Sequence, residues 1–274
     1  MSFEISAEQR YKDHQDDLAR LRGLRPIDDD FMRCIFRDNI PLAQLVLRII
    51  TGKDDLIVTH LETQKDLKRL VGARSICLDA DATDSENMKY DIEVQRSEAG
   101  AGVHRARYHS SCMDVENLDA GQDFDELPDT FTIILTEKDH FGEGLPLYKI
   151  ERVNLSTNKL FNDGEHIIYV NGSYRDDSDI GKLMHDFCCW NPEEMYFDLF
   201  RETTKYYKET QEGVETMCRA FEEVREQGIE RGRELTQIEN IRNLMENLKL
   251  TAQQAMDALG IPMAEQEKLL VKVS

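Results

Sequence analysis

Two alternating segments joined by a polar connection, between Arg74 and Tyr108, constrain the fold of this chain more than any other part of its sequence. Apolar and polar residues alternate in ICLDADA and again in KYDIEVQ, which predicts two β-strands. The segment TDSEN between them is rich in turn-forming residues, so we expect the strands to pair antiparallel. The polar residues that share a face are Cys77, Asp79 and Asp81 in the first strand, and Asp91, Glu93 and Gln95 in the second.

Up to four carboxylates would meet on one small area of this hairpin. Like charges at such a spacing raise one another's pKa values unless a cation or water relieves them. A cluster of oxygen ligands is typical of sites for hard divalent ions such as Mg2+. A hairpin with one solvated acidic face has the same pattern, and the alternation alone leaves both interpretations open.

The charge of the chain is strongly acidic, but its basic residues gather beside the hairpin. The 274 residues carry a formal net charge of −20, from 34 Lys and Arg against 54 Asp and Glu. A negative net charge argues against a nucleic-acid partner. It does not exclude one, because the electrostatic potential at a site depends on the charged residues nearby. One patch supplies Lys65, Lys68, Arg69 and Arg74, and the other supplies His104, Arg105, Arg107 and His109. We therefore expect any anionic ligand to bind at this one place.

Two further features of the sequence bear on the cellular compartment in which we expect the protein. No apolar run approaches the roughly 18 to 20 residues that span a bilayer, and the N-terminus lacks the pattern of a signal peptide, so we expect no membrane association. The six cysteines contain no C-x-x-C pair, which argues against a zinc ribbon and a disulfide scaffold. These observations together favour a reducing cytoplasm.

The order of the predicted elements indicates an α/β domain followed by helices. Helices are expected from Asp28 and from Pro41, before a strand at 55–63 and the hairpin. A helix at 103–118 follows, then strands at 131–138, 145–153 and 165–172. After these strands the chain becomes helical, and a long charged helix begins near residue 212. We therefore expect one domain over residues 1–212 and a helical extension over 213–274.

The C-terminal tail predicts a bundle of short helices. Thr251 is expected to cap one helix, Gly260 to end it and Pro262 to start the next. This order resembles a helix-turn-helix DNA-binding unit. The candidate recognition helix, Thr251–Leu259, contains no Lys or Arg and carries Asp257, however. The tail therefore favours a small bundle for docking or for homo-oligomerisation.

An ordered set of motifs over residues 25–212 resembles the recombination-promoting nucleases, also described as PD-(D/E)XK nuclease family transposases. The set begins with DDDFMRCIF and continues with R-x4-D at Arg74 and Asp79, YDIEVQ, and R-x-R-Y from Arg105 to Tyr108. It then runs through LPDTFTIILTEKDHFGEGLPLYKIER and GEHIIYVNGSY. The D…E-x-Q core alone is a weak signal, whereas the ordered set is specific.

The resemblance implies an α/β fold of the restriction-endonuclease type, with a mixed central sheet flanked by helices and here a C-terminal all-helical extension. It implies a Mg2+- or Mn2+-dependent DNA endonuclease linked to mobile DNA or recombination. Asp79 and Glu93 take the positions of the acidic metal ligands, and the backbone carbonyl of Val94 is expected to add an oxygen. Asp30 matches the acidic helix start of the family motif. We expect Asp30 to act either as an auxiliary metal ligand or as a plain helix cap. Asp81 and Asp91 are not required by the motif, and we expect them to be solvated at the open end of the hairpin.

Gln95 departs from the family-wide motif, which has Lys at this position. A neutral amide can orient a water molecule, but it supplies no positive charge and no base at pH 7. Hydrolysis by the catalytic set Asp79, Glu93 and Gln95 would then depend more heavily on the metal, and on Arg105 or Arg107 to hold phosphate. The candidate phosphate-binding residues are Arg74, Arg105, Arg107 and Tyr108. The alternative is a catalytically weak or inactive nuclease fold that acts as a DNA- or protein-binding module.

Overall fold

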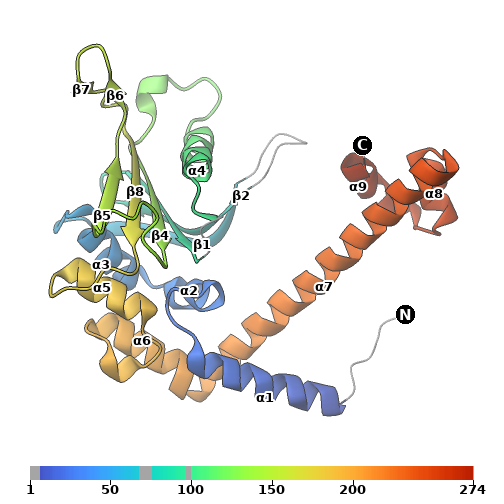
Figure 1. Ribbon diagram of the computed structural model, residues 1–274, viewed down its shortest axis with the longest axis horizontal. Coiled ribbons are helices and arrows are strands. Elements are labelled where there is room, and N and C mark those ends of the chain that lie inside the picture. Colours follow the sequence, from blue (N-terminus) through green and yellow to red (C-terminus); the bar gives the residue numbers. More distant parts are fainter. Residues whose placement is uncertain (1–6, 68–75, 97–99, 274) are drawn as a thin grey trace. The chain divides into compact units, whose positions relative to one another are not determined.

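The computed structural model describes residues 7–67, 76–96 and 100–273, with the side chains of residues 7–10 left out. Arg74, one of the predicted phosphate-binding residues, lies outside the described residues. The chain forms two compact units, and the division between them falls after Cys218. Helix α7 (Gln211–Leu248) contains this division (Figure 1). No helix in the described part of the chain has an apolar segment long enough to cross a membrane.

The first unit is built on a six-stranded mixed sheet with the strand order β1-β2-β3-β4-β8-β5. Strands β1, β2 and β3 are antiparallel to one another, β3, β4 and β8 are parallel, and β5 is antiparallel to β8. The strands are β1 (Val58–Leu67), β2 (Ile76–Asp84), β3 (Lys89–Gln95), β4 (Thr130–Thr136), β5 (Leu147–Ile150) and β8 (Glu165–Asn171). The predicted hairpin and the mixed central sheet are confirmed.

The predicted strand at 145–153 is divided in the structure. Its first part is β5, at the edge of the large sheet, whereas Val153–Asn154 forms β6 and pairs with β7 (Lys159–Leu160) in a separate two-stranded sheet (Figure 1). Arg152, between the two parts, forms ion pairs with Asp163 and Glu165. Strand β8 begins at Glu165, directly after Asp163 and Gly164, and the ribbon β6–β7 lies before it in the chain.

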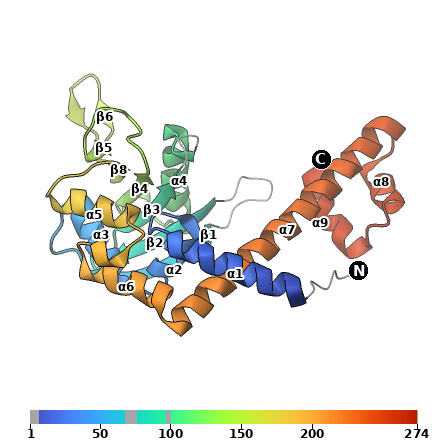
Figure 2. The ribbon, with the colours of Figure 1, turned by 60° about the horizontal axis from the view of Figure 1, so that its bottom comes forward.

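Helices cover both faces of the sheet (Figures 1 and 2). Helix α4 (Val103–Glu116) packs on one face, where its Ala106 joins Ile134 of β4 and Tyr169 of β8 in one apolar cluster. Helices α2 (Asp29–Phe36) and α3 (Ile40–Thr51) pack against β1, and α3 also contacts α5 and α6. The other helices of this unit are α1 (Ala7–Gly23), α5 (Asp179–Cys188) and α6 (Asp198–Glu209).

Local sequence explains where α2 and α3 begin and end. Asp28 lies at the N-cap position of α2, and two more acids occupy its first turn, where they interact favourably with the helix dipole. Asn39 caps α3 by accepting a hydrogen bond from the backbone N–H of Leu42. Gly52 ends α3 with a φ of 75°, a left-handed conformation that favours glycine. Both helices match the predicted starts.

Two acids of the hairpin β2–β3 are buried, contrary to the expectation of a solvated acidic end. Asp81 is 4% exposed and Asp91 is fully buried. The reason is tertiary, because β1 pairs along β2 and β4 pairs along β3, while helices cover the faces. The expectation that Asp81 and Asp91 are solvated was therefore wrong.

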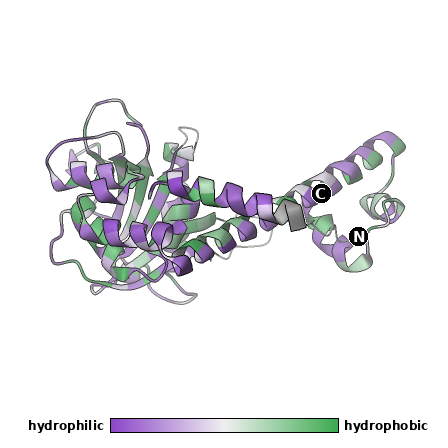
Figure 3. Cartoon of the chain, turned by 90° about the horizontal axis from the view of Figure 1, so that it is seen from below, coloured by the Kyte–Doolittle hydropathy of each residue, from purple (hydrophilic) through white to green (hydrophobic). Residues whose placement is uncertain are grey.

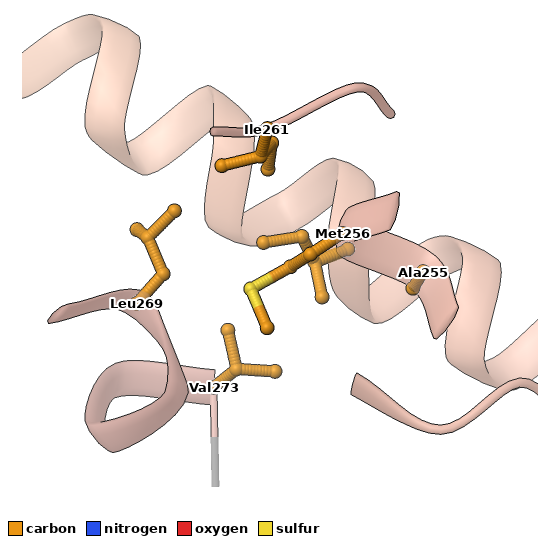
Figure 4. Packing of buried hydrophobic residues seen from close by; sticks show 6 residues of the cluster. Ala255, Met256, Ile261, Leu269 and Val273 are labelled. Carbon is orange, nitrogen blue, oxygen red and sulfur yellow. The ribbon is translucent and has the colours of Figure 1, made fainter. Parts of the chain in front are cut away.

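The C-terminal unit contains the end of α7 with α8 (Ala252–Ala258) and α9 (Met263–Val273). Thr251 and Gln254 form a capping box at the start of α8, and Gly260 has a φ of 68° after that helix. Six buried side chains form the core of this unit (Figure 4): Ile241, Ala255, Met256, Ile261, Leu269 and Val273. Coloured by hydropathy, the helices carry hydrophilic and hydrophobic residues in alternation along the ribbon, as expected of helices that place one face on a core (Figure 3).

Candidate active site

The candidate site begins where strands β2 and β3 stop pairing. Their ladder ends at the pair Ala80 and Ile92. Beyond it, the backbone N–H of Asp79 donates to Glu93 Oε1 at 3.1 Å, and the backbone N–H of Val94 donates to Asp79 Oδ2 at 3.2 Å. Two carboxylates therefore take the place of the next ladder partners, and the structure brings Asp79 and Glu93 together across neighbouring strands.

Glu93 and Asp91 are almost fully shielded from water, and Asp79 is partly buried. Glu93 is 1% exposed, and burial together with the charges of Asp91 and Asp79 raises the pKa of Glu93 to about 9. Burial also raises the pKa of Asp79 and holds the pKa of Asp91 well above its usual value. Acids become hard to ionise when they share a site of low dielectric without a compensating cation. To ionise together, these acids therefore require more positive charge than the neighbouring side chains supply.

His109 of α4 lies against this group of acids. Its Nδ1 lies 3.1 Å from Asp91 Oδ2 and 3.5 Å from Glu93 Oε1, and the side chain is 2% exposed. Arg105, four residues earlier on the same face of α4, places its Nη2 3.3 Å from Glu93 Oε2. One turn of helix thus presents an imidazole and a guanidinium to the same carboxylate.

Sequence reasoning placed His109 in a basic patch and did not connect it with the hairpin. The signal in the sequence is the spacing of four between Arg105 and His109, which puts both on one helix face. The spacing does not identify which acids these side chains contact. The position of α4 beside β3 depends on how the helix packs on β4 and β8. Asp91, assigned to solvent from the sequence, is the other member that only the fold reveals.

The donor set of Asp91, Glu93 and His109 fits a divalent cation. One ligand atom from each lies within 4.8 Å of the others, and all three residues are buried. Asp91 Oδ1 is buried and has no hydrogen-bond partner in the described part of the chain. Carboxylate oxygens suit Mg2+ and Mn2+, and imidazole suits the transition metals. Such an ion would also meet the requirement for positive charge.

A cavity of about 1060 Å3 lies beside these acids. Asp79, Val94 and Gln95 line it from the sheet, and Asp29 and Arg33 line it from α2. The predicted phosphate-binding residues of α4 line the same cavity: Arg105, Arg107 and Tyr108. The cavity therefore has acids at one part of its wall and cationic side chains at others.

Two neutral side chains, Gln95 and Gln64, donate toward the acids. Gln95 Nε2 lies 3.5 Å from Glu93 Oε2, at the limit of a hydrogen bond. Gln64 Nε2 donates to Asp79 Oδ1 at 3.2 Å, and Gln64 has a φ of 58° within β1. This strained backbone turns the Gln64 amide toward Asp79. Sequence reasoning missed Gln64, because a left-handed residue inside a strand leaves no pattern in the sequence.

Asp30, predicted as an auxiliary ligand or a cap, lies apart from this cavity. Its carboxylate forms an ion pair with Arg20 of α1 and lines a second, smaller cavity. Its neighbour Asp29 faces the first cavity instead, and burial raises the pKa of that carboxyl. The acidic run at the start of α2 therefore contributes one residue to each cavity.

Comparison with known proteins agrees with the geometry. A family model described as PD-(D/E)XK nuclease family transposase matches residues 40–185, which is more than half of the chain. The match includes the hairpin, α4 and the parallel strands that surround the site. No curated protein and no solved structure matches the chain. On this match, the chain belongs to the PD-(D/E)XK nuclease family transposases.

Proposed function

We propose that this protein is a divalent-metal-dependent endonuclease that hydrolyses phosphodiester bonds in DNA linked to mobile elements or recombination. One observation carries the proposal. Two acids on neighbouring strands, the partly buried Asp79 and the buried Glu93, converge beside a cavity that cationic side chains line. Acids of this kind hold a cation, and the cationic side chains suit the phosphates of a nucleic-acid backbone.

In this proposal Asp79 and Glu93 hold one Mg2+ or Mn2+ ion, and the backbone carbonyl of Val94 adds an oxygen. Asp91 and His109 each place one further potential metal-ligand atom near the carboxylate of Glu93. A bound divalent ion lowers the pKa of a water molecule and neutralises charge on the phosphate. The side chains of the protein would position the substrate, exclude water and hold protons.

Arg105 and Arg107 are proposed to bind phosphate oxygens from α4, with Tyr108 beside them. Gln95 is proposed to orient the attacking water through its amide, which both donates and accepts hydrogen bonds. Since acids prevail over the chain as a whole, the cationic lining of one cavity confines the DNA backbone to the site.

Plasmid nicking tests the proposal. Wild-type protein is expected to convert supercoiled DNA to the nicked form with Mg2+ or Mn2+ and to lose this activity in EDTA. Asp79→Asn removes one negative charge from the site and is expected to lower the rate at least 100-fold, as loss of a metal ligand does. Glu62→Gln is the matched control, because Glu62 lies on the adjoining strand β1 with a side chain that is 51% exposed. Equal nicking by wild type and Asp79→Asn, or none with any metal, refutes the proposal.

A second candidate function is a nuclease fold that binds DNA without cleaving it efficiently. The observation in its favour is Gln95, which gives strand β3 no cation next to Glu93. Calorimetric titration with Mn2+ and with a DNA duplex distinguishes the two functions when it is combined with the nicking assay. Binding of both ligands without any nicking favours the second.

A further inference from the structure

Part of the positive charge at the proposed site is already engaged by acids. Gln95 is neutral, and several cations nearby are already paired with acids. Arg105 is bonded to Glu93, and Arg96 forms ion pairs with Asp28 and Glu137. Each of these guanidinium groups has part of its charge compensated before any phosphate arrives.

Arg33 of α2 differs from these side chains. It lines the cavity together with Asp79, yet no hydrogen bond and no ion pair joins it to another residue in the described part of the chain. Its Nε is buried from water and has no hydrogen-bond partner among the described residues. A guanidinium N–H that is withdrawn from water and bonded to nothing is uncommon in folded proteins, and here it belongs to a side chain that lines a cavity.

The helix that carries Arg33 is firmly anchored. Its neighbours in the sequence, Met32 and Cys34, are buried in the core, as are Phe31, Ile35 and Phe36. Arg33 and Asp29 are four residues apart, so they lie on the same face of α2 and both line the cavity. The base of the Arg33 side chain is therefore fixed, and binding a ligand there costs little further ordering of the backbone.

Electrostatic effects on neighbouring groups agree with this placement. Burial raises the pKa of Asp29 and of Asp79, and the positive charge of Arg33 opposes the rise in both carboxyls. The charge of Arg33 therefore reaches the same acid that the proposed function assigns to the metal.

We propose that Arg33 is a phosphate-binding residue that donates hydrogen bonds to a non-bridging oxygen of the DNA backbone beside Asp79. It would supply, from a helix, the positive charge that Gln95 does not supply from strand β3. This inference rests on the proposed function, since it assigns Arg33 to the same substrate. A guanidinium suits this role, because it stays charged at all working pH values and presents several donors in one plane.

DNA binding, measured apart from cleavage, tests the inference. Fluorescence anisotropy of a labelled duplex in Ca2+ gives the dissociation constant at several salt concentrations. Arg33→Gln is expected to weaken binding by about 10- to 100-fold, as the loss of a charge-assisted hydrogen bond does. It is also expected to reduce the slope of log K against log salt by about 0.9, the value for one lost phosphate contact. Arg33→Lys keeps the charge and is expected to keep the slope.

Arg37→Gln is the matched control. Arg37 follows the last turn of the same helix, is exposed and does not line the cavity, so the same loss of charge there is expected to change the dissociation constant less than about twofold. Arg33→Met, whose aliphatic chain fills similar space in a helix, is measured alongside. A change in the salt slope in both neutral variants identifies a lost phosphate contact, because a fold defect lowers the active fraction and leaves the slope unchanged.

The outcomes separate this inference from the proposed function. Nicking by wild type with unchanged salt slopes in Arg33→Gln and Arg33→Met overturns the role of Arg33 and leaves the nuclease standing. A reduced slope in both variants without nicking by any form of the protein supports the phosphate contact and refutes the nuclease. Failure of wild type to bind the duplex refutes both.

Discussion

Replacing Glu93 by Gln is expected to stabilise the metal-free protein at neutral pH. Burial and the neighbouring acids raise the pKa of Glu93 from 4.5 to about 9. Between these pH values the folded chain holds a proton that the unfolded chain releases, so the free energy of unfolding falls as the pH rises, by up to about 1.4 kcal/mol per pH unit. At pH 7, about 2.5 units above the unfolded value, the carboxyl has cost the folded state about 3 kcal/mol.

Glutamine keeps the shape of this side chain and does not titrate. Glu93→Gln should therefore match wild type near pH 4.5 and exceed it by about 3 kcal/mol at pH 7. For a chain of this size, this gain corresponds to a rise in melting temperature of about 6 to 12 °C. Urea unfolding in EDTA, followed by circular dichroism from pH 4.5 to 9, measures the difference.

Glu62→Gln is the control for this experiment, since removal of an exposed carboxylate should change the free energy of unfolding by less than about 0.5 kcal/mol. The reasoning is refuted if Glu93→Gln is no more stable than wild type at pH 7. It is also refuted if the difference between the two proteins is the same at every pH. A stabilised and inactive variant would indicate that the acids at this site serve function at the expense of folding.

Three further predictions concern the metal and the C-terminal unit. Mn2+ at 100 times its dissociation constant should stabilise wild type by about 2.7 kcal/mol, and calorimetry should show no such shift for Asp79→Asn. Met256→Ala, at a fully buried position, should destabilise the C-terminal unit by about 2 to 5 kcal/mol. Hydrogen exchange in α8 and α9 measures this loss, and Met263→Ala, at a side chain 82% exposed, should leave exchange unchanged. Thr251→Ala removes a capping box and should cost about 1 kcal/mol in the unfolding of the same unit, with unchanged denaturant midpoints refuting the role of the cap.

Local patterns in the sequence were sufficient for the hairpin and for much of what surrounds it. Alternation over ICLDADA and KYDIEVQ identifies β2 and β3, and the turn residues between them set their antiparallel pairing. The register that the structure shows pairs Ala80 with Ile92, and it places Asp79 and Glu93 across from each other just beyond the end of the ladder. The caps at Asn39 and Thr251 act within one helical turn, so the starts of their helices follow from the sequence as well.

Burial could not be obtained in this way. Asp81 and Asp91 alternate with apolar residues just as solvated acids do, and only the neighbouring strands and α4 remove them from water. The prediction of a solvated end failed because alternation records which face a side chain occupies and not what covers that face.

The sequence by itself determined the strands, the helix ends and the acids that face one another across the hairpin, since those depend on residues a few positions apart. The tertiary structure alone decided that His109 lies beside Asp91, and that Arg33 reaches the cavity of Asp79 with its Nε unpaired. These groups come from different elements, and their approach is set by the packing of helices on the sheet. Packing depends on the shapes of many side chains at once, so no local pattern contains it.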